Sequence, residues 1–476
     1  MEHIIQQIVA AFVKKATEYL VQHGIGEIGK MSEDMLEMSK DAARELMAAF
    51  IKDADEALVG LKEERRADGL SVHERGVPRT VYTSLGPVTY RRTYFKTNAG
   101  MGCLLDGVLG VGPYERIDRA VSADMVDKAG RMSFGRAADM ATGGGVSRQT
   151  AHRKAMGCGE VAMAPKKAAR ASGAIHIFAD EDHVSMQDGS GAILPLITVC
   201  SGKERVSEGR NELTDRVHIN CFGLSPEKRW EYAYAVCEEM FGMDREVYIY
   251  GDGAPWISAS DACFPGAVHV LDAQHYRQRM TGILAGDICS RYTLRLYGAV
   301  KGRDKEAFGG LLYEIMGAVM QGMPECGQRK ARLKAVRESG AYILGNWGAV
   351  MNMGREGSIG SCTEALVSHV LSERFSRSPM GWSKAGLGKM SMIRVFVENG
   401  GRVMPEDIGA GRAKGGAGCA EKARIERYEG LIRRQQDEVF EGMKDWSVFV
   451  PEGAPPGAPS GTKTLIDALG RMRGVV

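Results

Sequence analysis

Apolar residues recur along roughly the first 70 positions at the three- to four-residue spacing of amphipathic helices. The pattern changes at residues 79–96, where two β-rich runs lie on either side of Gly86 and Pro87 and the second run is strongly basic. Two such runs around a turn predict a β-hairpin. We therefore expect a helical N-terminal region over residues 1–74, followed by a basic hairpin and its connector over residues 75–111.

Helical periodicity returns over residues 112–170, where two helices flank a turn of three glycines, Gly143 to Gly145. Ser147 stands just before the second helix, in the position of an N-cap. This spacing is typical of a helix-turn-helix, whose second helix lies in the major groove of DNA. Five side chains of that helix are expected to contact phosphates or base edges: Arg148, Gln149, His152, Arg153 and Lys154.

An ordinary pair of antiparallel helices with a solvated basic face explains the same pattern, and three successive glycines make a loose turn for a helix-turn-helix. The segment after the second helix is also basic, with Lys166, Lys167 and Arg170. Clustered basic residues are the electrostatic footprint of nucleic-acid binding. This segment favours DNA binding as the role of residues 112–170.

Further along, the pattern becomes one of short β-rich runs separated by Gly-rich or polar turns. Runs at 175–186, 193–200 and 215–224 predict an antiparallel meander. They are followed by a helix capped by Ser225, a fourth strand that ends at Asp252, a helical segment, a fifth strand and another helix. The order β-β-β-α-β-α-β-α is that of the ribonuclease-H-like fold. We therefore expect an α/β protein with a mixed five-stranded sheet.

The remaining segments complete the expected organisation. Residues 283–357 are helical in pattern and rich in Arg and Lys, and they are too long for a loop, so we interpret them as a helical insertion. The insertion separates the first part of the ribonuclease-H-like core, residues 171–282, from its final helices, residues 358–404. Residues 405–476 are expected to form a linker, a charged helix and a tail.

Three consecutive carboxylates, Asp180, Glu181 and Asp182, lie in the middle of the first core strand, which should be buried. In the expected fold this strand and the fourth are neighbours at the sheet centre, so Asp180 faces Asp252. Two such carboxylates repel each other unless a divalent cation lies between them. Glu364, at the start of the last core helix, is expected to be the third ligand. An all-oxygen site suits Mg²⁺ or Mn²⁺ better than zinc.

Two of these acids also have simpler interpretations. Asp252 and Gly253 are a common pair in the turn after a strand. Ser361 and Glu364 have the spacing of a capping box, in which the glutamate only closes the start of a helix. The metal interpretation depends on all three acids together, since each falls where this fold needs a ligand.

The identity of two ligands stays open. Asp182 points to the same face of the strand as Asp180 and is its rival or its auxiliary as a metal ligand. Glu373 and Glu356 are weaker alternatives to Glu364.

Asp272 and His275 are spaced as D-x-x-H across the junction between the fifth strand and the next helix. In one interpretation His275 lies beside the metal ions and a phosphate and takes part in catalysis. In the other, Asp272 is an N-cap and His275 an ordinary residue of the first turn, and spacing alone favours this cap.

The charge balance limits where nucleic acid can bind. Lys and Arg number 62 against 60 Asp and Glu, so only local basic clusters are available for DNA. The ten cysteines are scattered singly without a CxxC pair, which favours reduced thiols in a cytosol. The N-terminus lacks a secretory-signal pattern and no apolar run has transmembrane length, so we expect a cytoplasmic, nucleoid-associated bacterial protein.

Four segments together resemble bacterial insertion-sequence transposases of the ISLre type, within the Mutator-like set that has an Asp-Asp-Glu triad: ADEDHVSMQ, YGDGAPWI, LDAQHYRQRM and GSCTEALVSHVLSERFSRSPMGW. The resemblance extends over about residues 75–400. It implies that Asp180, Asp252 and Glu364 bind the catalytic metal ions, with the D-x-x-H pair and the helical insertion as further marks of the set. Many relatives have Asp-Gly at the first acid, whereas here Glu181 follows.

Arg374, Arg377 and Trp382 follow Glu364 on a helix and loop. They are candidates to steer or stack a DNA end beside the metal ions. Surface charge and a buried aromatic side chain explain them equally well.

We therefore expect a Mg²⁺-dependent (or Mn²⁺-dependent) transposase that binds the terminal inverted repeats of an insertion sequence, cuts at the ends and joins them to target DNA. Its partner is double-stranded DNA, and it acts as a homo-oligomer because two ends must be brought together. No membrane or small-molecule substrate is expected. The alternatives are a sequence-specific DNA-binding regulator or domesticated, inactive transposase, and a ribonuclease-H-like nuclease, because a fold alone does not determine the substrate.

Overall fold

The computed structural model describes residues 2–23, 27–97, 100–162, 168, 173–378, 380–409 and 419–441. The basic residues Lys166, Lys167 and Arg170 and most of the expected C-terminal linker and tail lie outside these ranges. The chain forms two compact units. The first consists of Met1–Val126, Phe134–Gly159 and Met404–Val476, and the second of Asp127–Ser133 and Glu160–Val403.

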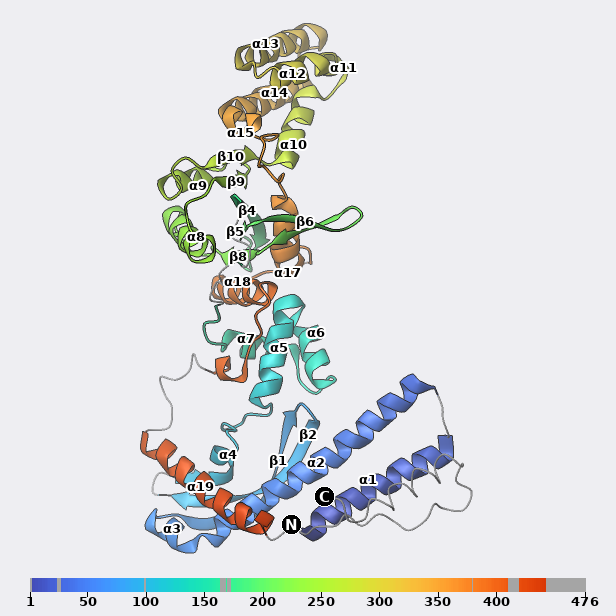
Figure 1. Cartoon of the computed structure of the whole chain (residues 1–476), viewed down its shortest axis with the longest axis vertical. Helices are drawn as coiled ribbons and strands as arrows, with labels where there is room; N and C mark the ends of the chain where they lie inside the picture. Colours follow the sequence, from blue (N-terminus) through green and yellow to red (C-terminus); the bar gives the residue numbers. More distant parts are fainter. Residues whose placement is uncertain are drawn as a thin grey trace. The chain divides into compact units, whose positions relative to one another are not determined.

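The first unit combines long helices with a three-stranded sheet (Figure 1). Its elements include α1 (Glu2–His23), α2 (Ile28–Gly60), α3 (Lys62–Ala67), β1 (Ser71–Thr83), β2 (Gly86–Thr97), β3 (Gly100–Gly102), α4 (Leu104–Val108), η3 (Pro405–Asp407) and α19 (Cys419–Glu441). Strands β1 and β2 pair antiparallel with Thr83 opposite Gly86, so the predicted hairpin is present. Helix α2 packs against β2, and Leu58, Phe95 and Tyr428 share one buried core.

Three helices continue from this sheet: α5 (Arg119–Arg131), α6 (Phe134–Thr142) and α7 (Arg148–Met156). Gly143 and Gly144 form the turn between α6 and α7 with φ angles of +61° and +84°, which glycine adopts without strain. Ser147 is at the N-cap position of α7, although its side chain makes no capping hydrogen bond. The predicted pair of helices around a glycine turn is therefore present.

The second unit contains the predicted mixed five-stranded sheet, in the order β10-β9-β4-β5-β8. The strands are β4 (Ile175–Ser185), β5 (Gly191–Cys200), β8 (Val217–Asn220), β9 (Val247–Gly251) and β10 (Val268–Leu271). The first three pair antiparallel as a meander, while β9 pairs parallel with both β4 and β10. The first and fourth strands of this unit are therefore neighbours at the sheet centre, as the element order predicted.

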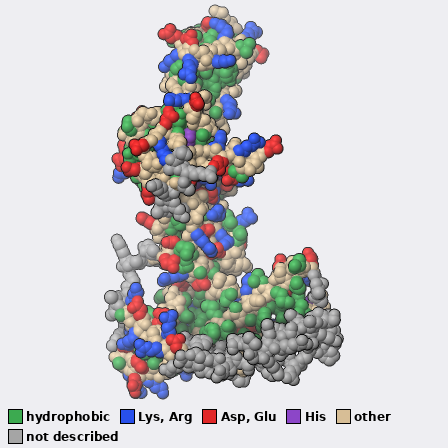
Figure 2. All heavy atoms as spheres, viewed as in Figure 1, with side chains coloured by type: hydrophobic (Ala, Val, Ile, Leu, Met, Phe, Trp, Pro, Cys, Tyr) green, Lys and Arg blue, Asp and Glu red, His purple; other side chains and the backbone are tan. Residues whose placement is uncertain are grey.

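A second hairpin, which the sequence did not predict, lies between β5 and β8. It is formed by β6 (Gly202–Ser207) and β7 (Arg210–Thr214), which pair only with each other. Lys, Arg and Glu side chains cover it from both strands (Figure 2), and Arg210 pairs with Glu212 at 2.7 Å. Its charged residues lack the apolar alternation of a half-buried strand, and the predicted third strand at 215–224 is shortened to Val217–Asn220.

The two faces of the central sheet pack against different partners, because successive strand residues point to opposite sides. On one face, Ile177 of β4 packs with Trp230 of α8 (Pro226–Phe241), which Ser225 caps as predicted. On the other face, Phe178 packs with Tyr250 of β9 and with Leu366. Asp180 and Asp182 lie on the Phe178 face by the same alternation, among the residues that close that side.

Helices form most of the remainder of this unit: α9 (Pro255–Ser258), η1 (Ala259–Ala262), α10 (Ala273–Leu284), α11 (Asp287–Ser290), α12 (Thr293–Lys301), α13 (Lys305–Gly322), α14 (Gly327–Gly345), α15 (Trp347–Met351), α16 (Thr363–Val367), the π-helix η2 (Ser368–Ser372), α17 (Glu373–Phe375) and α18 (Lys384–Glu398). The expected insertion is helical and has a core of its own, with Phe308, Ile315 and Val336. The boundaries expected for the segments stay predictions. None of the described helices is long and apolar enough to cross a membrane.

Candidate active site

The parallel pairing of β4 and β9 sets the positions of the first two acids. Phe178 is opposite Tyr250, and Asp180 and Asp252 each lie two residues further along their strands. Both carboxylates therefore leave the sheet at the same edge. Asp180 is only 8% exposed, whereas Asp252 is half-buried at the start of the following turn.

Electrostatic coupling links these acids to Glu364 and His275. Burial raises the pKa of Asp180 to about 7, against a lowering effect of the hydrogen bond from the Glu181 amide. The negative charges of Asp252 and Glu364 raise the same pKa further, and His275 lowers it. Asp252, His275 and Glu364 therefore each lie within electrostatic reach of Asp180 at this edge of the sheet.

Glu364 lies in the first turn of α16, and its side chain is exposed. The capping-box interpretation of this residue is wrong. The N-cap is Cys362, no side chain caps this helix, and the Ser361 hydroxyl donates to the Asp272 carboxylate instead. In a capping box the Ser361 hydroxyl would accept a backbone amide in the first turn of the helix, and no side chain makes such a hydrogen bond here.

Asp252 forms the turn that its pairing with Gly253 suggested. Its Oδ1 accepts a hydrogen bond from the Ala254 amide at 2.8 Å, and Gly253 has a φ of +78°. A β-carbon on Gly253 would overlap the side chain of Asn346, which directly follows α14, and Tyr342 of α14 donates to the Asp252 main-chain carbonyl. The insertion thus packs directly against the turn that carries Asp252.

Asp272 is the N-cap of α10, as spacing alone favoured, and His275 is nevertheless close to the acids. The Oδ1 atom of Asp272 accepts hydrogen bonds from the amides of Gln274 at 2.8 Å and His275 at 3.1 Å. It also lies 3.2 Å from Nδ1 of His275. This hydrogen bond, opposed by burial, raises the pKa of His275, and the charges of Asp180 and Asp252 raise it further. The two interpretations of the D-x-x-H pair are therefore compatible.

Asp182 is buried like Asp180 but has a different neighbour. Its Oδ1 accepts a hydrogen bond from the Ser376 hydroxyl at 3.1 Å, and among the described residues its Oδ2 has no hydrogen-bond partner. Burial raises its pKa, although hydrogen bonds from Ser376 and Ser372 lower it. Asp182 is therefore directed towards the segment after η2 and not towards Asp252.

The side chains at this edge are of the type that binds a divalent cation, but they do not have the arrangement of a metal site in this structure. Three carboxylates are the oxygen donors that Mg²⁺ and Mn²⁺ prefer. Within the described ranges, however, no group of three or more His, Cys, Asp or Glu side chains has the arrangement of a metal site. Oδ1 of Asp180 and Oδ1 of Asp252 each accept one hydrogen bond from a nearby backbone amide, which leaves the second oxygen of each carboxylate able to bind a cation.

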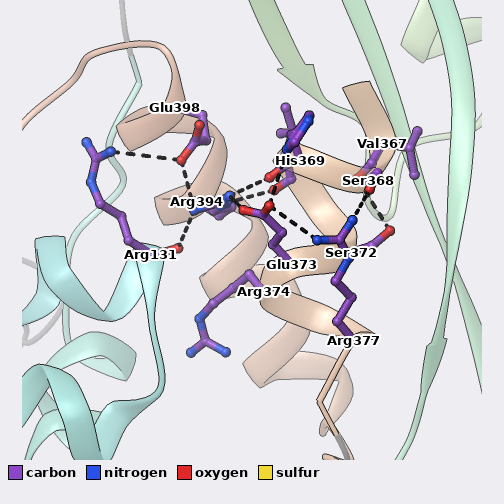
Figure 3. A network of polar contacts seen from close by, with 12 residues as sticks. Arg131, Val367, Ser368, His369, Ser372, Glu373, Arg374, Arg377, Arg394 and Glu398 are labelled. Atoms are coloured by element: carbon purple, nitrogen blue, oxygen red, sulfur yellow. Dashed lines mark hydrogen bonds and ion pairs between the residues drawn. The ribbon is translucent and has the colours of Figure 1, made fainter. Parts of the chain in front are cut away.

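Glu373, a weaker candidate for the third ligand, belongs to a separate polar network around η2 (Figure 3). Its carboxylate pairs with Arg377 at 3.3 Å and with His369 at 3.2 Å. Arg394 of α18, which is buried, donates from Nε to the Val370 carbonyl at 2.7 Å and from Nη2 to the His369 carbonyl at 2.5 Å. Glu373 is thus paired with Arg377 and Arg394, whereas Glu364 has no such pair among the residues that the structure describes.

Arg374 and Trp382, two residues expected near DNA, lie in the interior. Nε of Arg374 donates to the Ala129 carbonyl at 2.8 Å, and its guanidinium lies over the Trp382 ring at 4.9 Å. Burial and the charge of Arg394 lower the pKa of Arg374 to about 10. Trp382 therefore follows its buried alternative, whereas buried Arg374 is neither a DNA contact nor surface charge in this conformation. Arg377, which is exposed, is left as the candidate.

Four of the five side chains expected to read DNA from α7 are exposed: Arg148, Gln149, His152 and Arg153. Lys154 differs, because it is half-buried and its ammonium pairs with Glu115 at 2.5 Å. In the hairpin, Arg79 and Arg92 likewise both pair with Asp106. Intramolecular ion pairs thus neutralise part of the basic character that the sequence displays.

The model of one protein family, described as Uncharacterised protein family (UPF0236), matches residues 22–409 of the chain. The chain belongs to this family. It is 28% identical over 457 residues to a UPF0236 protein of Caldanaerobacter subterraneus subsp. tengcongensis, with 94% of both chains covered. The name of that relative joins eleven designations, from TTE0033 to TTE2212.

Two further members come from the same organism. UPF0236 protein TTE2489 is 28% identical over 419 residues, with 87% of each chain covered. UPF0236 protein TTE0402 is 28% identical over 457 residues, which are 94% of this chain and 89% of the relative. The similarity extends over most of each chain.

Sequence reasoning missed two contacts at this edge. Tyr342 reaches the Asp252 carbonyl from 90 positions away, and Thr363 donates to Asp272 from 91 positions away. A tyrosine in a helical pattern and a threonine before a helix are ordinary, so no local signal distinguishes either residue.

Proposed function

We propose that this chain is a metal-dependent DNA transposase of the Asp-Asp-Glu type, similar to insertion-sequence transposases of the ISLre type. The observation that carries the proposal is the meeting of Asp180, Asp252, Glu364 and His275 at one edge of the central sheet. These residues come from three distant parts of the sequence. Keeping Asp180 buried beside the negative charges of Asp252 and Glu364 is costly, and function is the usual reason for such an arrangement.

The topology of the sheet supports this proposal. Three antiparallel strands followed by two parallel ones, in the order β10-β9-β4-β5-β8, are the arrangement of the ribonuclease-H-like fold. In that fold the first and fourth strands are neighbours, which puts their acids together. A helical segment after the fifth strand, between Asp252 and Glu364, is also what the resemblance to Mutator-like transposases implies.

The relatives give independent support. Eleven designations in one name mean that the same protein name belongs to many places of one genome. Many copies in one genome are what an element leaves when it moves by copying itself. A metabolic enzyme or a regulator is not expected at that copy number.

Asp180, Asp252 and Glu364 would hold the divalent cations, and His275 would lie beside the phosphate. Asp182, whose carboxylate is directed towards Ser376, would be the auxiliary only after its side chain turns. When bound, Mg²⁺ or Mn²⁺ activates a water or a 3′-hydroxyl and stabilises the leaving oxygen. Because Asp180 has a pKa of about 7, its carboxyl group must lose its proton to become a ligand near neutral pH. Cation binding should therefore release a proton.

The exposed side chains of α7 would bind the terminal repeats, and two chains or more would bring two ends together in the cytoplasm at the nucleoid. Arg148 and Arg153 are exposed and carry positive charge on this helix, whereas Lys154 is paired with Glu115. Double-stranded DNA is thus the proposed partner.

The test is cleavage and joining of DNA that carries the ends of the element, with Mg²⁺ or Mn²⁺. Single variants Asp180→Ala, Asp252→Ala and Glu364→Ala should lose activity while keeping the fold. Asp188→Ala is the matched control, because Asp188 is an exposed acid in the turn after β4. Full activity in all three folded variants would refute the site.

A DNA-binding regulator derived from a transposase is the second candidate, favoured by the absence of a metal-site arrangement among the described residues. It predicts specific DNA binding through α7 without cleavage at any cation concentration. A ribonuclease-H-like nuclease is the third, and it predicts that RNA–DNA hybrids are cut in preference to element ends.

A further inference from the structure

The carboxylate of Asp272 accepts hydrogen bonds from two separate chain segments. It lies at the junction of β10 and α10 and is 3% exposed. One of its oxygen atoms accepts hydrogen bonds from the start of α10, and the other accepts them from the segment before α16. An N-cap needs only the first of these contacts.

Oδ1 faces the start of α10. It accepts the amides of Gln274 and His275 and lies 3.2 Å from the imidazole Nδ1 of His275. The last contact orients the ring, since one ring nitrogen is engaged by Asp272 and the other is left for a second partner. Asp272 thus holds the His275 side chain as well as the start of α10.

Oδ2 faces the residues just before Glu364. It accepts the hydroxyl of Ser361 and, at 2.7 Å, the hydroxyl of Thr363. Thr363 is 1% exposed and is the residue immediately before Glu364. These partners are 89 and 91 positions from Asp272, so helix capping does not account for them.

Other contacts hold the same segment against the sheet. The hydroxyl of Tyr250 in β9 accepts the amide of Ile359 at 3.0 Å and lies 3.3 Å from the hydroxyl of Ser358. Residues 358–363 are therefore fixed at both ends, by Tyr250 at one end and by Asp272 at the other. Glu364 is the residue that directly follows the attachment to Asp272.

The protonation state of Asp272 agrees with this arrangement. Burial by itself raises its pKa, but the hydrogen bonds from His275, Ser361 and Thr363 together lower it well below its usual value. Asp272 is thus ionised at neutral pH without a metal ion. With both oxygen atoms already accepting two or more hydrogen bonds, it has little capacity left for a cation.

We propose that Asp272 is a positioning residue that holds His275 and Glu364 in register at the edge of the sheet, and that it is not itself a metal ligand. The inference rests on the proposed function in one respect, that Glu364 binds a cation. The hydrogen bonds from Ser361 and Thr363 to Oδ2 position Glu364. The hydrogen bond from His275 to Oδ1 positions the imidazole ring, so separate mutations can remove the two effects.

The test compares the full-length wild-type chain with Asp272→Asn, Thr363→Val and the control Asp261→Asn. Asp261 is a matched control because it pairs with His269 at 2.7 Å but is exposed and outside this edge. Mn²⁺ affinity is measured by titration, and the protonation of the His275 ring is followed by NMR. The exchange of the amide hydrogens of residues 361–366 is measured without metal.

Thr363→Val should weaken Mn²⁺ binding about 10-fold or more, as loss of a partner behind a ligand usually does, and leave the His275 titration unchanged. Asp272→Asn should weaken Mn²⁺ binding and also lower the pKa of His275, because the neutral amide no longer favours the imidazolium. Unchanged Mn²⁺ affinity in folded Thr363→Val would overturn the proposal. If Asp272→Asn does not fold, the Mn²⁺ affinity of Thr363→Val is enough to support or overturn the proposal.

Failure of the proposed function has a different signature. If the wild-type chain binds no Mn²⁺ and cuts no DNA, Glu364 is not a ligand, and amide exchange without metal then tests the positioning role. Faster exchange at residues 361–366 in Thr363→Val than in Asp261→Asn supports it. Equal exchange in these two variants contradicts it.

Discussion

At the scale of a single residue, the burial of the Asp180 carboxyl group makes the free energy of unfolding depend on pH. Its pKa is about 7 in the folded chain, against an ordinary value of 3.8. As pH rises above 3.8, the unfolded chain ionises first, so the free energy of unfolding falls with pH and stops falling above about pH 7. The shift corresponds to at most about 4 kcal/mol.

Asp180→Asn should remove this dependence. We expect denaturant unfolding at pH 4 to 8 to show that the wild-type chain loses stability relative to the variant as pH rises. Saturating Mg²⁺ should reduce the difference, because a cation stabilises the ionised carboxylate. Parallel stability curves for the two proteins, without Mg²⁺, would show that the pKa is ordinary.

The positions of Asp180 and Asp252 could be predicted from the sequence, whereas the state of Arg374 could not. The strand order brings the two acids together, and that order follows from the β-rich runs and the helices between them. Arg374 looks like a surface residue, because arginine is seldom buried. Its burial depends on carbonyl acceptors at Ala129, almost 250 residues away in the chain.

At the scale of elements, Arg394 fixes the π-helix η2. Its guanidinium donates to the carbonyls of His369 and Val370 and pairs with Glu398 at 2.8 Å. Arg394→Lys keeps the charge but loses the forked geometry, so it should destabilise the chain by about 3 kcal/mol, as breaking a buried pair does. Thermal or denaturant unfolding measures this, with Arg377→Lys, at an exposed position, as a control that should change little.

Helix α7 offers a direct test of DNA binding, since neighbouring basic residues differ in their surroundings. Arg153 is exposed, whereas Lys154 pairs with Glu115. Arg153→Ala should weaken DNA binding and reduce the slope of log affinity against log salt by about 1, the value for one lost phosphate contact. Lys154→Ala should leave the slope unchanged, and equal effects of the two variants would contradict a role for α7 in contacting DNA.

The elements themselves were largely predictable, but the hairpin β6–β7 was not. The five strands of the central sheet alternate or concentrate apolar residues, which is a signal in the sequence. Six of the thirteen residues from 202 to 214 are charged instead, and the two strands pair locally. A charged hairpin is hard to distinguish from a loop when no apolar face has to be buried.

At the scale of the whole molecule, the second unit is not one continuous stretch. It includes Asp127–Ser133, the end of α5 and the turn after it, together with Glu160–Val403. The carbonyls of Ala129 and Gly130 accept hydrogen bonds from the buried guanidiniums of Arg374 and Arg394. The organisation expected from the sequence kept residues 112–170 together, since nothing in the pattern of α5 indicates these distant partners.

A fragment of residues 160–403 should therefore be less stable than the same unit in the full chain. Two buried arginines lose carbonyl acceptors, and an unsatisfied buried charged donor costs about 1–3 kcal/mol or more. The measurement is the unfolding midpoint of the fragment compared with a fragment of residues 119–403, which restores α5. Equal midpoints would show that these hydrogen bonds do not stabilise the unit.

The insertion enters and leaves at nearly the same point. It starts from α10, whose cap is Asp272, and its helix α14 returns to the turn at Gly253 through Asn346. The link between α12 and α13, where Arg303 has a φ of +58°, is exposed over residues 301–307. Both ends of the insertion are held against the central sheet, so a fluorescent protein inserted into this link should not disturb the carboxylate edge. Such a fusion would allow the chain to be tracked in living cells.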